Sequence, residues 1–356
     1  MSLLTEFEKN LDVLKEQGLY RSLTPLEAVS ASPVRAGFKG DDYLLFCSND
    51  YLGLSCDPRL KRVAAEVIHM YGVGSGASRL ISGTTVWHQR LEESIARFKR
   101  KKRAVVFSSG FLTNVGIITA VTDKKSLIVL DKADHASIID AARLSGAALR
   151  VYPHKNMEKL EKILQGAGKY NRVLIVTDSV FSMDGDHAPL HDIIALKRKY
   201  GAVLMLDEAH ALGVFGERGS GLAEEHDCED DIDIAMGTLS KAAGTVGGYC
   251  AVDHILAEYI INKSRPFIYT TSLPAHICAA ACEAMTIIET DRSLRRLLWE
   301  RTRKIREIIE KNGFTMGDSC GPILPILIGD EERALSFSRK LFDQGIYVPA
   351  VRYPTV

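Results

Sequence analysis

Two short segments carry residues that could do chemistry together. Lys241 stands in the run Gly237-Thr-Leu-Ser-Lys241-Ala-Ala-Gly244, and Asp207 follows the apolar run Val203-Leu-Met-Leu206, 34 residues earlier. A lysine among small and hydroxyl residues can form a Schiff base, and an aspartate that ends a buried strand can keep a pyridinium nitrogen protonated. The order of these two residues therefore indicates a site for pyridoxal 5'-phosphate, with Lys241 and Asp207 as catalytic residues.

The phosphate of such a cofactor needs backbone N–H donors at the start of a helix. The segment Phe107-Ser-Ser-Gly-Phe-Leu-Thr-Asn114 is typical of a strand, a glycine turn and a helix, although an ordinary serine-capped turn is the alternative. Hydroxyl groups elsewhere could add further contacts, some of them from a second subunit. The expected phosphate ligands are Ser109, Gly110, Phe111, Thr238, Thr270 and Thr271.

Two histidines and a serine complete the expected cofactor site. His135 follows a predicted strand, where a flat imidazole could cover the pyridine ring and still form hydrogen bonds; a surface histidine or a helix cap is the alternative. His210 lies three residues past Asp207 and could bond the phenolic oxygen of the cofactor. Ser182 stands in the run Val180-Phe-Ser-Met-Asp-Gly-Asp186. With Asp207 holding the ring nitrogen, the site would delocalise charge from an amino acid's α-carbon, and Lys241 would be the general base.

The composition excludes several other classes of function. The 356 residues carry 45 basic and 45 acidic side chains, so no net field favours nucleic acid or an anionic membrane. The basic run Lys99–Arg103 is expected to end a helix. No apolar run of about 18 residues predicts a membrane span, and seven cysteines without a CxxC pair indicate reduced thiols in a cytoplasm. His276, Cys278 and Cys282 fall in an alanine-rich helical stretch that predicts helix packing, so no metal is expected.

Short apolar runs alternate with helical segments along the middle of the chain. Such runs, ending in Asp, Ser or Thr, predict an α/β sandwich with a mostly parallel sheet. The expected strands are 105–107, 127–130, 173–177, 203–206, 232–236 and 248–252. A helical stretch over 274–309, a strand over 323–328, a helix over 331–344 and a strand over 345–351 should follow. We expect a helix and arm over 1–52, a large α/β domain over 53–290 and a smaller α+β domain over 291–356.

Two other classes of protein share parts of these patterns. The run Asp207-Glu-Ala-His210 is also typical of a DEAH-type ATPase, but no GxxxxGK[ST] loop occurs in the sequence. The run Gly72-Val-Gly-Ser-Gly-Ala-Ser78 resembles a dinucleotide-binding loop, yet it follows a predicted helix and lacks the last glycine. A scaffold that binds the cofactor without catalysis is a third alternative, and it is disfavoured because Asp207, His135, His210 and Lys241 occur together.

Several motifs resemble those of the α-oxoamine synthases, which are fold-type-I pyridoxal-phosphate enzymes. The resemblance runs from about Leu11 to Val356 and keeps the family order. It rests on Ser48-Asn-Asp-Tyr-Leu-Gly-Leu54, Gly74-Ser-Gly-Ala-Ser-Arg-Leu-Ile-Ser-Gly83, Asp134-His-Ala-Ser137, Val180-Phe-Ser-Met-Asp-Gly-Asp186 and Gly237-Thr-Leu-Ser-Lys241. It implies an aspartate-aminotransferase-like fold, a homodimer with shared active sites, and decarboxylative condensation of an amino acid with an acyl thioester.

Within the family, the sequence is most similar to the branch that joins L-alanine to a pimeloyl thioester in biotin synthesis. That resemblance implies Arg21 as a ligand of the distal pimeloyl carboxylate and Asn49 as a ligand of the amino-acid carboxylate; a solvated arginine is the alternative for Arg21. It also implies that His135 donates to the developing oxyanion. A branch that uses glycine and acetyl-CoA is the nearest rival. The acyl carrier could be CoA or an acyl carrier protein.

The resemblance departs from the family pattern at the carboxyl terminus. Family members continue past Pro354-Thr-Val356 with an Arg-Leu-Arg strand, which carries the carboxylate-binding arginine, and a final helix. Arg352 belongs to the preceding segment and does not replace that arginine. We therefore expect that the sequence given omits a carboxyl-terminal segment, and that restoring it would restore affinity for the amino acid.

Overall fold

The structure is a computed structural model that describes residues 2–27, 29–31 and 34–352. The chain divides into two compact units, one made of residues 49–327 and one that combines residues 1–48 with 328–356. The three-part division expected from the sequence, with boundaries at 52/53 and 290/291, stays a prediction. None of the helices in the described ranges is long and apolar enough to cross a membrane.

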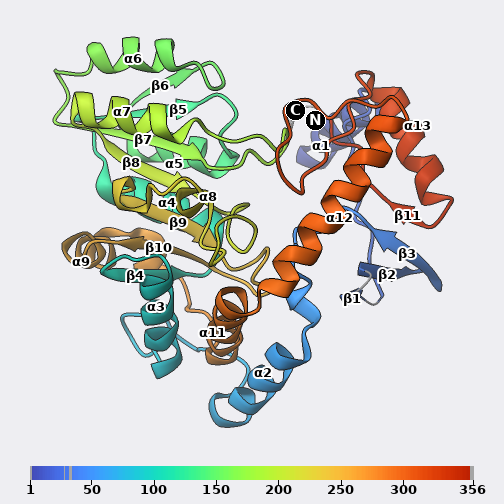
Figure 1. Cartoon of the computed structure of the whole chain (residues 1–356), viewed down its shortest axis with the longest axis horizontal. Coiled ribbons are helices and arrows are strands. Elements are labelled where there is room, and N and C mark those ends of the chain that lie inside the picture. Colours follow the sequence, from blue (N-terminus) through green and yellow to red (C-terminus); the bar gives the residue numbers. More distant parts are fainter. Residues whose placement is uncertain (1, 28, 32–33, 353–356) are drawn as a thin grey trace. The chain divides into compact units, whose positions relative to one another are not determined.

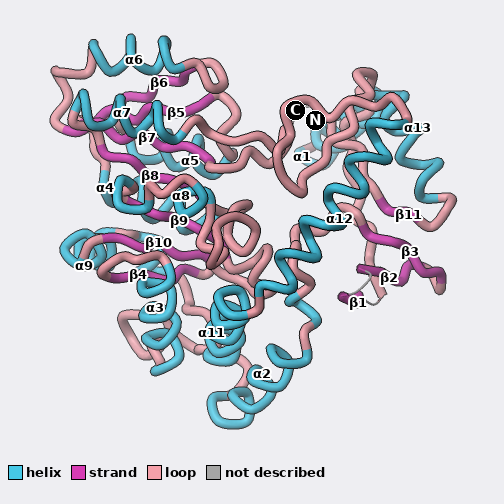
Figure 2. The backbone as a smooth tube through the Cα atoms, viewed as in Figure 1, coloured by secondary structure: helices cyan, strands magenta, loops and turns pink. Residues whose placement is uncertain are grey.

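A seven-stranded sheet forms the centre of the larger unit, in the order β4-β10-β9-β8-β7-β5-β6 (Figure 1). Its strands are β4 (Arg103–Phe107), β5 (Ser126–Asp131), β6 (Ala148–Tyr152), β7 (Arg172–Asp178), β8 (Val203–Asp207), β9 (Ile234–Thr238) and β10 (Gly248–Val252). Strand β10 lies between β4 and β9 (Figure 2). It is antiparallel to both, while the other pairs are parallel. The carboxyl ends of β4, β5, β7, β8 and β9 therefore lie along one edge, where α/β sheets bind ligands.

Helices cover both faces of this sheet, because alternate residues of each strand are buried in two separate clusters. In β5, Leu127 and Val129 belong to one cluster, and Ile128 and Leu130 belong to the other. The first cluster includes residues of α3 (Val86–Phe98), α6 (Met157–Gln165), α7 (Leu190–Tyr200) and α11 (Ala275–Thr290). The second includes residues of α4 (Gly110–Val121), α5 (Ala136–Ser145), α9 (His254–Lys263) and α10 (Arg265–Tyr269). The predicted α/β fold with a mostly parallel sheet is confirmed.

Five further elements belong to the larger unit. They are η1 (Leu54–Cys56), α2 (Pro58–Tyr71), α8 (Leu222–Glu225), η2 (Glu229–Asp231) and α12 (Arg292–Lys311). Helix α3 ends at Phe98, so the basic run that begins at Lys99 does follow a helix end, as predicted. Helix α2 immediately precedes the glycine-rich run that starts at Gly72.

The smaller unit brings the two ends of the described chain into one sheet. Its elements are α1 (Leu3–Glu16), β1 (Val29–Ala31), β2 (Val34–Phe38), β3 (Asp41–Leu45), α13 (Glu331–Phe342) and β11 (Ile346–Tyr347). The strand order is β1-β2-β3-β11, and β11 is parallel to β3. The rings of Tyr43 and Phe342 stack with centroids 4.4 Å apart, so aromatic contacts join β3 to α13.

Three predicted elements differ from the observed ones. The strand expected over 323–328 does not form, because Pro322 and Pro325 deprive this segment of ladder donors. The helical stretch expected over 274–309 is broken at Asp291, whose carboxylate accepts the N–H of Ser293 and starts α12. The last strand is limited to β11, since Pro349 follows it closely. Strand β6 was not predicted because Arg150 interrupts its apolar run at the edge of the sheet.

Candidate active site

Asp207 ends β8 with a buried carboxylate that is held by hydrogen bonds alone. The Ala209 N–H donates to Oδ1 (2.9 Å), and the side-chain amide of Asn114, on α4, donates to Oδ2 (2.8 Å). Within the described ranges, no cationic nitrogen lies within 4.0 Å of this carboxylate. A buried carboxylate normally has a partner of opposite charge. Asp207 is therefore suited to bind a cationic ligand group.

Lys241 and His210 meet at the same edge of the sheet. Lys241 follows β9, and its Nζ lies 2.6 Å from Nε2 of His210. The other ring nitrogen of His210, Nδ1, lies 2.7 Å from the hydroxyl of Tyr51. Burial, followed by the nearby charge of Lys241, lowers the pKa of His210 to about 3, so this imidazole is neutral at physiological pH.

The ionisation of Lys241 and Tyr51 is also set by burial. Burial lowers the pKa of Lys241, although Asp207 and Asp178 oppose the shift. Burial raises the pKa of the Tyr51 phenol, which therefore stays protonated and can donate to His210. A lysine with a lowered pKa holds a larger fraction of free amine near neutral pH, as a Schiff-base nucleophile or a general base requires.

His135 begins α5 and is held on two sides. Its backbone N–H donates to Oδ2 of Asp178 (2.9 Å), and its Nδ1 accepts the backbone N–H of Ser137 (3.3 Å). The same Nδ1 lies 2.8 Å from the Ser137 hydroxyl. Loss of water around the ring lowers the pKa of His135, and Lys241 lowers it further while Asp207 opposes the shift. His135 is nevertheless an exposed residue, so part of its imidazole is accessible to a ligand.

The predicted phosphate turn has the geometry expected from the sequence. Ser109 caps α4 by accepting the N–H of Leu112 (3.2 Å), so the first backbone donors of a twelve-residue helix face this turn. Gly110 lies against β9, because a Cβ atom here would be 3.2 Å from Oγ1 of Thr238. A Cβ atom on Gly248 would lie 2.8 Å from Cα of Gly110. Because Gly110 and Gly248 have no side chains, the turn can lie close to Thr238, where the loop that carries Lys241 (the lysine loop) begins.

The side chains of the other sequence-predicted site residues have no described hydrogen bond to this group. Thr270 and Thr271 line a small pocket that also contains Ser108, next to the phosphate turn. Ser182 is half-buried in the loop after β7, Phe111 is 46% exposed on α4, and Asn49 is exposed. Arg21 is an exposed residue of the smaller unit. Roles for Ser182, Phe111, Thr270, Thr271, Asn49 and Arg21 stay predictions.

Another lysine, which is fully buried, contacts the residue next to Asp207. Lys99, the C-cap of α3, forms an ion pair with Glu208, and the two side chains are 3% and 1% exposed. Lys99 also donates to the backbone oxygen of Ser220, and Glu208 accepts the N–H of Ala223 (3.0 Å). Burial alone would lower the pKa of Lys99, but the Glu208 carboxylate outweighs it and the pKa is raised. This pair anchors the loop that follows Asp207.

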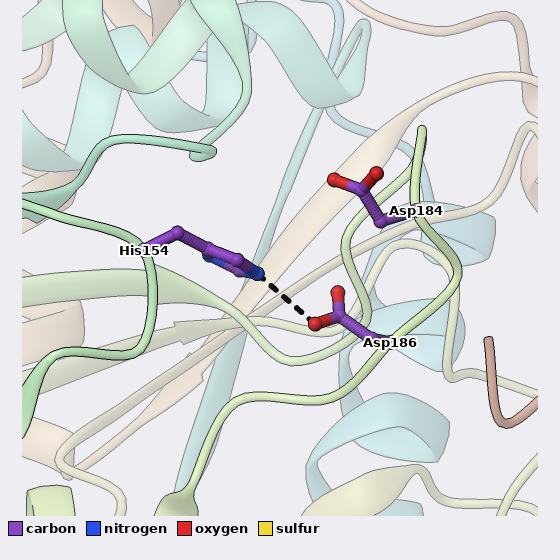
Figure 3. Close-up of side chains that lie close together, drawn as sticks. All are labelled: His154, Asp184 and Asp186. Atoms are coloured by element: carbon purple, nitrogen blue, oxygen red, sulfur yellow. Dashed lines mark hydrogen bonds and ion pairs between the residues drawn. The ribbon is translucent and has the colours of Figure 1, made fainter. Parts of the chain in front are cut away.

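One cluster could offer ligand atoms to a cation. The ligand atoms of His154, Asp184 and Asp186 lie within 4.8 Å of one another (Figure 3). However, Nε2 of His154 is 3.0 Å from Oδ2 of Asp186, and Lys155 forms an ion pair with the same carboxylate. The other ring nitrogen of His154 is 2.8 Å from Asp131. The cluster is a network of ion pairs that already contains its cations, and we assign no metal to it.

Sequence reasoning missed four residues that the structure places in or behind the site. Asn114 and Ser137 lie inside segments that were noted for their neighbours, and Tyr51 lies inside a motif that was noted for family resemblance. Lys99 was assigned to a helix end without a partner. Asn114 had a local signal, because it is the one amide side chain in the helix Gly110–Val121, whose other residues are apolar, glycine or threonine. The partner of Lys99 is 109 residues away, and no local pattern reports it.

The residues present fit pyridoxal phosphate. Asp207 provides a buried carboxylate without a cation, the α4 terminus provides backbone donors beside a glycine turn, and Lys241 provides an amine of lowered pKa. His210, with its Nδ1 bonded to Tyr51, can present an N–H at Nε2 to a phenolic oxygen. Each polar group of the cofactor thus has a chemically matched partner along one edge of the sheet.

Comparison with known proteins agrees with this assignment. The family model for aminotransferases class I and II matches residues 41–356. An 8-amino-7-oxononanoate synthase from Thermoanaerobacter pseudethanolicus is 45% identical over 350 residues, which cover 98% of this chain and 88% of that protein.

Two solved structures are similar over most of the chain. Serine palmitoyltransferase from S. paucimobilis, solved with a bound PLP–myriocin adduct, has a TM-score of 0.92 at 31% identity and covers 98% of this chain and 92% of its own. An 8-amino-7-oxononanoate synthase from Francisella tularensis has a TM-score of 0.77 at 31% identity and covers 88% of this chain and 89% of its own.

Proposed function

The chain belongs to the aminotransferase class I and II family and, within it, to the α-oxoamine synthases, and from this premise we propose that it makes 8-amino-7-oxononanoate for biotin synthesis. The reaction joins L-alanine to a pimeloyl thioester and releases CO2 and the free thiol. The observation that carries the proposal is the contact of Lys241 Nζ with His210 Nε2 beside the cation-free carboxylate of Asp207. The relative from Thermoanaerobacter pseudethanolicus supports the choice of reaction.

In this proposal each residue of the site has a stated task. Bound pyridoxal phosphate supplies an electron sink for charge that develops on the α-carbon of alanine. Asp207 would hold the ring nitrogen, and His210 would donate from Nε2 to the phenolic oxygen. Lys241 Nζ would take the α-proton, for which its lowered pKa suits it.

Carbon–carbon bond formation would use the other histidine. The α-carbon of alanine would attack the thioester carbonyl, and the thiolate would leave and take up a proton. The carboxylate of alanine would then depart as CO2, and the α-carbon would take up a proton in its place. His135 would donate a hydrogen bond to the oxyanion that develops on the carbonyl, because its Nδ1 accepts from Ser137 and leaves Nε2 as the donor. Its exposure keeps that nitrogen accessible to the acyl substrate.

The phosphate and the two carboxylates need separate binding groups. We propose that Ser109, Gly110 and Phe111 bind the phosphate with Thr238, and that Thr270 and Thr271 contribute from a second subunit. A homodimer with shared sites is supported by exposed apolar side chains on the loop that precedes α3: Leu80 is 51% and Ile81 is 81% exposed.

The remaining assignments concern the substrate carboxylates, the acyl carrier and the location of the protein. Arg21 and Asn49 stay proposed as ligands of the pimeloyl and alanine carboxylates, and Ser182 as a cofactor contact. An acyl carrier protein could present the acyl chain in place of CoA. A cytoplasmic location is supported by seven cysteines that are all free thiols in the structure.

Two alternatives are less favoured. A branch that uses glycine and acetyl-CoA would need the same cofactor residues, but the curated relative named above supports the alanine branch. A DEAH-type ATPase would need the acidic residue after Asp207 for its own chemistry. Glu208 is 1% exposed and paired with Lys99, so it is not available to a nucleotide or a metal.

A direct test uses isotope exchange and product analysis. The purified full-length protein is loaded with pyridoxal phosphate and incubated in D2O with L-alanine or glycine, and α-proton exchange is followed by NMR. We expect exchange with alanine, and 8-amino-7-oxononanoate by mass spectrometry when pimeloyl-CoA is added. Exchange confined to glycine would transfer the proposal to the glycine branch. Exchange with neither amino acid would reject both.

A further inference from the structure

A chain of hydrogen bonds connects the two residues that would lie on different sides of the cofactor. The amide nitrogen of Asn114 donates to Asp207 Oδ2 (2.8 Å) and to the hydroxyl of Ser137 (2.9 Å). The hydroxyl of Ser137 lies 2.8 Å from Nδ1 of His135. Asn114 and Ser137 are each 1% exposed, so water does not compete for these bonds.

The donors and acceptors of this chain can be arranged in only one direction. Asp207 accepts only, which places the Asn114 NH2 group toward it, and the second hydrogen of that group goes to Ser137. The Ser137 oxygen therefore accepts from Asn114 and uses its own hydrogen on Nδ1 of His135. The backbone N–H of Ser137 also points to Nδ1, at 3.3 Å. An imidazole that accepts at Nδ1 carries its hydrogen on Nε2.

We infer that Asn114 and Ser137 are positioning residues that fix His135 as the Nε2–H tautomer and tie that tautomer to the orientation of the Asp207 carboxylate. The inference rests on the proposed function for its catalytic meaning, because the Nε2–H is the group offered to the acyl substrate. The geometry itself does not depend on which amino acid or thioester is used.

The orientation of the Asn114 amide supports this role over a purely structural one. A rotated amide would place Oδ1 against the Asp207 carboxylate and would remove the donor to Ser137. In the observed orientation Oδ1 is buried and has no hydrogen-bond partner in the described ranges. A buried unpaired acceptor is costly, typically about 1–3 kcal/mol. The fold accepts this unpaired oxygen because the same orientation lets Asn114 donate to both Asp207 and Ser137.

The test reads the tautomer of His135 directly in the cofactor-free protein. Ring ¹⁵N chemical shifts of labelled histidine distinguish Nε2–H from Nδ1–H, and the signals of His135 are assigned by their loss in His135→Asn. We expect a single Nε2–H tautomer in the parent protein. Ser137→Ala should shift His135 toward a mixture, and Asn114→Ala should also shift it, although Asn114 does not touch the ring.

The same variants are then measured with the cofactor. Removing a hydrogen bond to a charged group should weaken cofactor binding in Asn114→Ala by about tenfold to a hundredfold. Ser137→Ala should lower kcat by about tenfold with a smaller change in the KM for alanine, as loss of one neutral hydrogen bond predicts. Ser137→Thr retains the hydroxyl and should restore both the tautomer and kcat.

Matched controls separate positioning from general packing. Ser126→Ala removes an equally buried serine at the opposite end of β5, and Thr122→Val removes the hydroxyl just beyond the far end of α4. Both should leave the His135 shifts unchanged. Unchanged His135 shifts in Ser137→Ala and Asn114→Ala would overturn the inference. If Asn114→Ala does not fold, Ser137→Ala and its rescue by threonine decide. A tautomer that follows Ser137 in a protein that makes no product would support the inference and reject the proposed function.

Discussion

Two lysines, the buried Lys99 and the half-buried Lys241, lie near the loop that follows β8, and their environments are opposed. Lys99 forms an ion pair with Glu208, and its pKa is raised. Lys241 has no ion pair within the described ranges, and burial lowers its pKa. The neighbouring acids follow the same division, since Glu208 has a cation and Asp207, one residue earlier, has none.

The two adjacent acids, Asp207 and Glu208, therefore have different roles: Glu208 stabilises the fold, and Asp207 is available to a ligand. A paired buried charge is neutralised inside the fold and offers nothing to a ligand. A buried acid without a cation and a lysine of lowered pKa are features that a folded protein retains where a ligand completes the electrostatics. The comparison therefore identifies the cofactor side of the turn without reference to any relative.

The largest expected effect is on the unpaired lysine. Lys241→Ala should lower kcat by at least about 10²–10⁴-fold, the contribution typical of a general base, with the fold intact by circular dichroism. In the parent protein kcat should rise with pH as Lys241 loses its proton, with a midpoint below the ordinary lysine value because burial lowers the pKa. Steady-state kinetics measure both. Lys125→Ala, at an exposed lysine, is the control. A Lys241→Ala protein as active as this control would contradict the role assigned to Lys241.

The paired lysine should show the reverse pattern. Lys99→Met leaves Glu208 buried without a cation, which should lower the free energy of unfolding by about 3–5 kcal/mol. Turnover per folded molecule should change far less than in Lys241→Ala. Urea denaturation followed by tryptophan fluorescence measures the loss. The double variant Lys99→Met/Glu208→Leu removes the orphaned charge and should regain much of that stability. A double variant less stable than the single one would contradict this account.

A smaller effect is expected one contact away from Lys241. Tyr51→Phe removes the hydroxyl that lies 2.7 Å from His210 Nδ1 and should lower kcat by about tenfold, the equivalent of one hydrogen bond of about 1.4 kcal/mol. Thermal stability should change little. Tyr200→Phe is the matched control, since the hydroxyl of Tyr200 bonds Glu161, which is not a residue of the site. Equal kinetic constants in the two variants would show that the Tyr51 hydroxyl has no role in the reaction.

The smallest effect concerns His154, a half-buried histidine between two buried carboxylates. Burial alone would lower the pKa of His154, but hydrogen bonds to Asp131 and Asp186 outweigh it, and the pKa is raised above 6.5. A raised pKa stabilises the fold below 6.5, and this contribution is lost as the pH rises through the folded value. His154→Gln should therefore cost about 1 kcal/mol near pH 5 and less above pH 8. Urea titrations at the two pH values measure the difference; a pH-independent cost would contradict it.

The fold was largely predictable because strands buried on both faces have continuous apolar sequences. The runs that end at Leu130, Thr177 and Leu206 predicted β5, β7 and β8 to within one or two residues. The segment 323–328 has the same apolar character but contains Pro325, and its backbone cannot form the ladder. The apolar composition of this segment predicts burial, but the lack of a backbone N–H donor at Pro325 prevents a strand.

Some site residues could likewise be predicted from local patterns, and others could not. Asp207, His210 and Lys241 were predictable because each lies at or just after the end of a strand, and strand ends meet at one edge of the sheet. Asn114 and Ser137 were not singled out, because their importance lies in contacts 93 and 23 residues away rather than in any local motif. Lys99 was predicted only to stand at a helix end, and its burial depends on the tertiary position of Glu208.

The position of β10 has a consequence for how the protein is synthesised. Strands β4 and β9 carry the phosphate turn and the lysine loop, but they do not pair with each other, because β10 lies between them. A chain that emerges from the ribosome as far as Lys241 still lacks the strand that aligns these two parts. The cofactor pocket can therefore assemble only after Val252 has been made, so that holoenzyme formation is a late event in translation.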